Sequence, residues 1–375
     1  MLHKINHPAC AGQLKQVVQF QRRVLVFSCR LRVPLALASI DIENEFGLKI
    51  GQWLWKKLWI KRKNTGKIEQ SELYKALGNF ADLMSKNPKL EASILEAFDR
   101  DIDFDNHINN PKFTFAYNSL SKQTKQVIKE LLELFYTELL ASGFPEEIHR
   151  DKGNFDRDKF VDSFWKANSK LEVCPACDRP RSPMVNNKIY SDADHFLPKS
   201  RYPFLSVHPA NLVPLCLDCN RNFKGDRDPI EDPGKAPLIN TFHPYFNPAI
   251  DQVNIRTNRN AEGVRVIQIE DKAGMPSRRV ESINRVFNLE KEWIDGLRYS
   301  IDSIIDEIQS AGKRLRKRGI DLTRQELEME LKDMLSERTK KLGQRHFFVL
   351  HRSYLEFAIK DSSELDKLFE QFKGI

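Results

Sequence analysis

The sequence predicts an α+β fold, with a small core bracketed by cysteines and flanked by mainly helical N- and C-terminal regions. Two Cys-x-x-Cys pairs enclose a segment with strand-like residues, apolar residues recur at helical spacing on both sides, and one pair of alternating segments follows. We therefore expect a poorly patterned basic extension, a helical region, the core, a loop with a β-hairpin, and a second helical region, at residues 1–40, 41–170, 171–230, 231–275 and 276–375.

The N-terminal regions differ in how clearly they are patterned. The first forty residues show no clear period, so we expect the compact protein to begin near Asp41. The segment Gln52–Lys63 holds three tryptophans and five cations, and is either an amphipathic helix that buries Trp55, Leu58 and Trp59 or a segment that grips nucleic acid. Apolar residues at intervals of three and four then predict two helices over 69–100 with a break near Pro88, one over 121–142, and one over 156–168.

The C-terminal regions begin with a hairpin signal. Val253–Thr257 and Val264–Glu270 alternate in period two around a turn that contains Gly263. The basic run Lys313–Arg318 is either a phosphate-binding run or a solvated turn between helices. Helical spacing predicts helices over 278–309, 324–341 and 344–372.

Charge and cysteine content limit the possible classes of protein. The net charge is +8, and residues 1–65 hold 12 Lys/Arg against 3 Asp/Glu, so the basic character is local. Charged residues and Pro34 interrupt the apolar stretch Val24–Ile40, which excludes a membrane span and a signal peptide there. Four of the six cysteines stand in metal-type pairs, which favours the reducing cytoplasm over secretion.

The two cysteine pairs predict a structural zinc site. Cys174 and Cys177 form one pair, and Cys216 and Cys219 form the other. Each pair can direct two thiolates at one tetrahedral ion at about 2.3 Å, which closes the coordination sphere and leaves no open position for chemistry. Residues 178–215 are a longer insert than a zinc ribbon has, so we expect the insert to carry the function.

Polar residues of nuclease type lie in and just after this insert. Asp194 and His195 follow the β-prone residues 188–190, Asn211 comes before the second cysteine pair, and Asn220 and Lys224 come after it. The run DADHFLPKS…NLVPLCLDCNRNFKGD resembles the HNH endonuclease family, whose ββα-metal finger it matches over roughly residues 174–229. The family's last His is replaced by Asn220, as in the HNH domain of RNA-guided nucleases.

The resemblance implies a role for each matching residue. His195 would be the general base, suited by an ordinary pKa of about 6.5. Asp194 and Asn220 would bind one Mg²⁺ or Mn²⁺ ion. Asn211 would orient the His195 strand through backbone hydrogen bonds. Nearby cations that could contact phosphates are Lys199, Arg221 and Lys224.

These residues predict a metal-dependent endonuclease that acts on DNA, most simply the double-stranded form. Because an HNH finger makes few base contacts, recognition would fall to the flanks or to another protein. The layout resembles HNH components of bacterial anti-phage defence systems, which often act with an ATPase. Two alternatives stay open: a zinc-stapled nucleic-acid-binding or scaffolding subunit without nuclease activity, and an RNA-cutting HNH nuclease. A zinc deaminase is excluded, since no His is followed by x-Glu.

Overall fold

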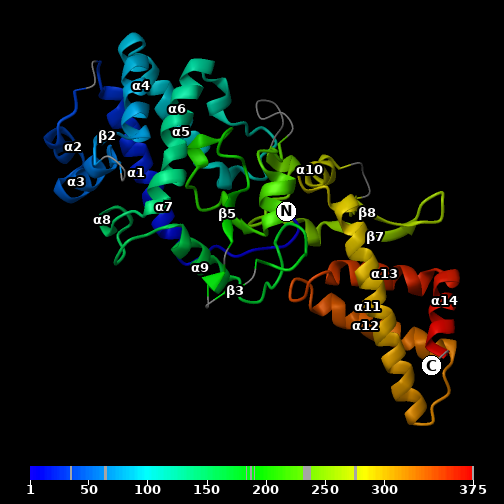
Figure 1. The fold of residues 1–375 in the computed structure, drawn as a ribbon. Helices are drawn as coiled ribbons and strands as arrows, with labels where there is room; N and C mark the ends of the chain where they lie inside the picture. The colour runs from blue at the N-terminus through cyan, green and yellow to red at the C-terminus, as the bar shows by residue number, and fades with distance from the viewer. Residues whose placement is uncertain are drawn as a thin grey trace.

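The computed structural model describes residues 1–33, 36–62, 66–182, 184–185, 188–189, 191–230, 238–273 and 277–373. The predicted α+β class is confirmed, because helices predominate and the described strands pair into four separate two-stranded sheets. Figure 1 shows the N-terminal helices around the strands of the central core, while one long helix leads away to a C-terminal helical module.

The N-terminal region is a helical lobe whose helices begin where the sequence supplies caps. The side chains of Ser71, Ser121 and Asp156 accept hydrogen bonds from backbone N–H groups in the first turns of their helices. The helices predicted over 69–100, 121–142 and 156–168 are confirmed, with a π-helical turn, Phe135–Leu139, inside the second segment. The lobe comprises α1 (Ala11–Arg30), α2 (Ser39–Phe46), α3 (Leu48–Lys57), α4 (Glu72–Lys86), α5 (Leu90–Asp101), α6 (Lys122–Leu134), α7 (Leu140–Ser142), α8 (Glu146–His149) and α9 (Arg157–Ala167).

The first forty residues are not the loose extension that we predicted. Leu14, Val17 and Leu25 of α1 are fully buried in the core. The sequence did not show a helical period here because Gln21 and Ser28 share the buried face of α1, so polar residues interrupt the apolar stripe. Before α1, the chain runs across the cysteine core, where the His3 N–H donates to the Pro175 carbonyl at 2.8 Å.

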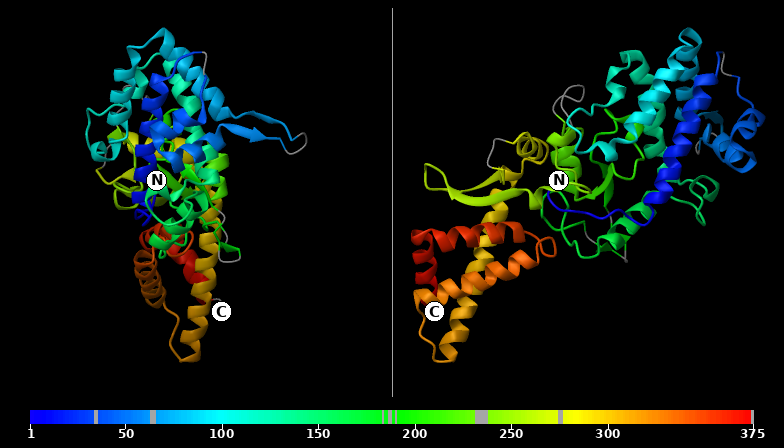
Figure 2. Two further views of the ribbon diagram at one scale, coloured as in Figure 1. Left: turned by 90° about the vertical axis from the view of Figure 1, so that its left-hand side faces the viewer. Right: turned by 180° about the vertical axis from the view of Figure 1, so that it is seen from behind.

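The tryptophan-rich segment is helical only in its first half. α3 ends at Lys57, and β1 (Trp59–Lys61) then pairs antiparallel with β2 (Ile68–Gln70) in a hairpin that projects from the body (Figure 2). Leu58 is fully buried as expected, while Trp55 and Trp59 are half-buried. Lys63 lies outside the described residues.

The core places its strands and one helical turn in the order β, β, α. β5 (Asp192–His195) pairs antiparallel with β6 (Leu212–Leu215), with His195 opposite Leu212 and Asp194 opposite Val213. A helical turn, Asp218–Lys224, follows β6 directly. A second small hairpin, β3 (Met184–Val185) with β4 (Lys188–Ile189), precedes β5.

The C-terminal region forms a hairpin and a group of helices. The predicted hairpin is confirmed, and the last predicted helix is divided in two at Asp361. Lys313–Arg318 is not a turn between helices, since Lys313–Lys317 form the largely exposed end of α11, and phosphate binding by this run stays a prediction. The elements are β7 (Val253–Arg259), β8 (Arg265–Asp271), α10 (Arg278–Phe287), α11 (Leu289–Lys317), α12 (Arg324–Lys340), α13 (Phe348–Lys360) and α14 (Ser362–Lys373).

Among the described residues, no helix combines the length and the apolar character that a membrane crossing requires.

Candidate active site

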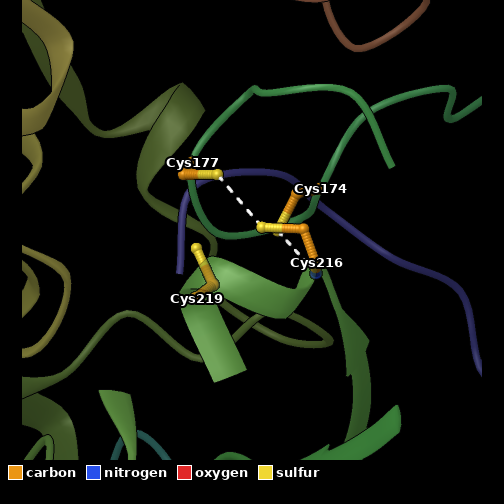
Figure 3. A group of neighbouring side chains, drawn as sticks. All are labelled: Cys174, Cys177, Cys216 and Cys219. Carbon is orange, nitrogen blue, oxygen red and sulfur yellow. Dashed lines mark hydrogen bonds between the residues drawn. The ribbon is translucent and has the colours of Figure 1, made fainter. Parts of the chain in front are cut away.

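The four predicted zinc ligands come together in one buried cluster (Figure 3). Their sulfur atoms all lie within 4.8 Å of one another, and the Sγ atoms of Cys177 and Cys216 are 3.8 Å apart. None of the four forms a disulfide, and all are buried. Four thiols at these separations fit a closed tetrahedral zinc site, which serves structure and not catalysis.

The first cysteine knuckle, Cys174 to Cys177 with the residues directly after it, also joins distant parts of the chain. The carboxylate of Asp178, fully buried, accepts a hydrogen bond from His3 Nε2 at 2.6 Å and another from the Val349 N–H at 3.1 Å. The indole N–H of Trp293, in α11, donates to the Cys177 carbonyl at 2.8 Å. The cluster therefore holds the N-terminus, α11 and α13 against the core.

His195 is buried and held in one orientation. Its Nε2 lies 2.8 Å from the Ser206 carbonyl, which can only accept, so Nε2 carries the proton and Nδ1 has the free lone pair. Burial lowers the pKa of His195 to about 3, the Ser206 carbonyl opposes this, and the charges of Lys199, Lys224 and Arg157 lower it further. The imidazole is thus neutral at physiological pH.

Ser206 connects this histidine to the helical lobe. Its hydroxyl donates to the Leu132 carbonyl of α6 at 2.8 Å and accepts from Gln21 Nε2 of α1 at 3.0 Å. The buried polar residue that hid the period of α1 thus helps to fix the carbonyl that orients His195.

Asp194 lies beside His195 on β5 and faces Lys224. The residue is 9% exposed, and its Oδ2 atom lies 3.3 Å from the Lys224 ammonium but accepts no hydrogen bond within the described part of the chain. Burial raises the pKa of Asp194, while the charge of Lys224 acts in the opposite direction. A buried carboxylate oxygen without a hydrogen bond fits a ligand of a hard cation.

Lys224 differs from the surface phosphate contact that we expected. Its side chain is almost fully buried, and its ammonium faces Asp194 because a buried carboxylate requires a compensating charge. Lys199 is half-buried and Arg221 is exposed, so both stay candidates for phosphate contact.

Asn211 has the bonding that a brace requires. Its fully buried side chain accepts from the Leu197 N–H at 2.7 Å and donates to the carbonyls of Leu197 at 3.0 Å and Leu205 at 3.1 Å. These bonds fix the loop that follows His195. Asn220 is half-buried on the same helical turn as Lys224, and its role as a metal ligand stays a prediction.

Two further residues at this site were missed by sequence reasoning. The Tyr136 ring meets the His195 ring edge-on at 4.3 Å, and its hydroxyl donates to the Ala193 carbonyl. The Arg157 guanidinium lies 5.2 Å from the center of the Tyr136 ring, and the Lys199 ammonium lies 5.7 Å from it. No local signal marks either residue, since Tyr136 lies within a helical apolar stripe and Arg157 simply follows a helix cap.

Fold and site together define an α+β protein with a buried four-cysteine cluster of the zinc-binding kind beside a strand that carries an Asp-His pair. No protein-family model matches the chain, and no solved structure matches it. Protein ea31 of Escherichia phage lambda is 35% identical over 98 residues, which are 26% of this chain and 28% of that protein. Septu protein PtuB of Bacillus thuringiensis is 42% identical over 52 residues, 14% of this chain and 20% of PtuB. The chain thus spans less than a third of either relative.

Proposed function

We propose that this protein is a metal-dependent endonuclease of the HNH type that hydrolyses phosphodiester bonds in DNA. The observation that carries the proposal is the setting of His195. A neutral imidazole has its proton fixed at Nε2 by the Ser206 carbonyl, at 2.8 Å, and stands beside a buried carboxylate on the same strand. This is the arrangement that a general base for water activation needs.

The proposed reaction uses the free nitrogen of His195. Nδ1 takes a proton from water, the water oxygen forms a bond to phosphorus, and the bond from phosphorus to the 3′ oxygen breaks. The leaving 3′ oxygen takes a proton from solvent water, and the imidazolium then returns its proton to solvent. A phosphodiester anion nearby would raise the low pKa of His195 and make it a stronger base. Asn211 would hold the loop that follows His195 in place through its hydrogen bonds to Leu197 and Leu205.

Asp194 and Asn220 would hold one Mg²⁺ or Mn²⁺ ion through carboxylate and amide oxygens. The Oδ2 atom of Asp194 is buried, faces a cationic group and accepts no hydrogen bond within the described part of the chain, which supports this assignment. A bound cation supplies neutralisation of the charge that builds on the phosphate. Lys224 would supply part of the same neutralisation from its place next to Asp194, at 3.3 Å.

The short similarity to PtuB supports a role in anti-phage defence, in which the protein would act with a partner such as an ATPase. The HNH resemblance, which implies a finger with few base contacts, supports the need for such a partner. Co-purification with the products of neighbouring genes tests this part of the proposal.

Replacing His195 tests the nuclease directly. Wild-type protein and His195→Ala are incubated with supercoiled plasmid and with structured RNA, each with Mg²⁺, Mn²⁺ or EDTA. We expect metal-dependent nicking of plasmid by the wild type and loss of nicking in His195→Ala, because the variant lacks the base but retains every cysteine. Circular dichroism and the melting temperature check that the variant folds.

His346→Ala is the matched control, since His346 is exposed. It should cleave like the wild type. Near-normal nicking by His195→Ala would refute the assigned base. Cleavage of RNA alone favours the RNA-cutting alternative, and metal-independent binding without cleavage favours a scaffolding subunit.

A further inference from the structure

An open groove in the C-terminal region lies away from the candidate active site. It runs between β7 and α13, which pack side by side (Figure 1), and has a volume of about 690 Å³. Five consecutive residues of β7, 254–258, line one wall, and residues of α13 with its C-terminal end line the other.

The lining is rich in cations and amides. Arg256 and Lys272 come from the hairpin side, and Arg352 and Lys360 come from α13, against two acidic side chains, Glu356 and Asp361. Asn254 and Asn258 flank Arg256 on β7, while the hydroxyls of Thr257 and Ser353 are buried and share a hydrogen bond at 2.9 Å. Arginine, lysine, amide and hydroxyl groups are the side chains that contact phosphate and sugar in nucleic-acid complexes.

Two of these cations lack full pairing. The Nε atom of Arg352 is buried without a hydrogen bond to any described residue, and lies 3.8 Å from Glu356, too far for one. Lys360 is exposed and forms no ion pair with the residues that the structure describes. Arg256 is more than half exposed although it pairs with Glu270 at 3.2 Å. The groove can therefore take additional negative charge.

We propose that this groove binds the sugar-phosphate backbone of the nucleic acid on which the protein acts, as a second contact remote from His195. The inference rests on the proposed function for the identity of the ligand. The side chains of Asn254, Arg256 and Asn258 share the less buried face of β7, because successive strand residues point to opposite faces. At about 3.3 Å per residue these three positions span about 13 Å, which suits several successive phosphates at about 3.4 Å of rise per nucleotide and exceeds the size of one small anion.

The salt dependence of binding measures these contacts. A fluorescently labelled DNA duplex is titrated with wild type and with Arg256→Gln/Lys360→Gln from 50 to 200 mM salt, with anisotropy as the readout. The buffer holds no added Mg²⁺ or Mn²⁺ and no chelator, because a chelator would remove a structural zinc ion. Loss of two phosphate contacts should lower the slope of log affinity against log salt by about 1.8, because each contact contributes about 0.9. Both side chains are exposed, so the fold should be unchanged, and circular dichroism checks this.

The matched control is Lys89→Gln/Lys122→Gln, which removes the same charge from exposed lysines of the N-terminal lobe. It should leave the slope unchanged. An equal slope in the groove variant and the control would overturn the proposal, as would a wild type that does not bind the duplex. If the groove variant instead loses a co-purified protein while keeping its DNA slope, the groove binds protein. Binding is measured without added Mg²⁺ or Mn²⁺, so a wild type that binds here but never nicks plasmid when those ions are supplied would refute the nuclease and leave the groove proposal intact.

Discussion

Arg157 and Lys199 give the site a positive charge that the motif alone does not. They come from α9 and from the loop after β5, and both lie over the ring of Tyr136, which contacts His195. Neither forms an ion pair with another described residue, whereas Lys224 is committed to Asp194. Two unpaired cations close to a neutral base suit a substrate with a negatively charged phosphate.

We expect Arg157→Ala to reduce kcat/KM for plasmid cleavage by roughly 10- to 100-fold, the range that corresponds to about 1.5–3 kcal/mol for a hydrogen bond to a charged group. Arg157→Lys should recover part of the loss, because it retains the charge but not the planar guanidinium.

Lys166→Ala is the control for this variant, since Lys166 is an exposed cation on the same helix and pairs only locally with Asp162 at 2.6 Å. It should leave the rate unchanged. If Arg157→Ala and Lys166→Ala cleave equally fast, Arg157 has no part in substrate binding.

The sequence predicted the residues of the site that share one local motif. Asp194, His195 and Asn211 could be found because their spacing is short and fixed by two strands. Tyr136 and Arg157 could not, because only packing of α9 and the α6–α7 segment brings them to β5. The burial of Lys224 also could not be predicted from the sequence, since a lysine three residues after an exposed arginine has no local sign of its partner.

The cysteine cluster joins the core to the C-terminal helices. Trp293 of α11 is fully buried and bonds to the Cys177 carbonyl, and the neighbouring Arg179 bonds to the Glu292 carbonyl at 3.1 Å. The start of α13 is held by Asp178. If the knuckle opens, these contacts lose their anchor.

We predict about one zinc ion per chain, and loss of that zinc in Cys219→Ser. The tryptophan fluorescence of the variant should shift to the red, because Trp293 becomes exposed to water when the knuckle opens. When Trp293 is already replaced by Phe, adding Cys219→Ser should cause no red shift.

Cys29→Ser provides the matched control, because Cys29 is also buried and lies outside the cluster. Zinc content measured by atomic absorption should be unchanged in this variant. A Cys219→Ser protein that keeps its zinc and its fluorescence would show that the cluster is not a metal site.

Elements were predicted where burial follows one period. The helices around Leu77 and Ile128 have wide apolar stripes, and the β7–β8 hairpin alternates cleanly. α1 was missed because its buried face includes polar groups with partners far along the chain, such as Gln21 with Ser206. The division between α13 and α14 was missed because Asp361, which ends the first helix, also begins the second through its side-chain bond to the Glu364 N–H.

Several histidines outside the site, spread through the molecule, are buried and uncharged. Burial lowers the pKa of His208 to about 3 and the pKa of His351 to about 4, and it lowers the pKa of His243 well below its ordinary value. The charge of Arg338 on α12 adds to the effect at His351, as does that of His346. Burial shifts the pKa of a buried acid in the opposite direction, raising that of Asp101 to about 7.

These buried histidines should make the protein sensitive to acid. Between the folded pKa and the ordinary value of about 6.5, the unfolded chain binds a proton that the folded chain does not, so the free energy of unfolding falls as pH falls below 6.5. Each histidine contributes about 1.4 kcal/mol per pH unit in this range.

Urea denaturation at pH 7.5 and at pH 5.5 measures this effect. The wild type should be less stable at pH 5.5, and the loss of stability in His351→Gln should be smaller by about 1.4 kcal/mol. His107→Gln, at a half-exposed ring, should lose as much as the wild type. An equal loss in His351→Gln and the wild type would mean that His351 takes up a proton as readily in the folded protein as in the unfolded chain, which would refute the prediction.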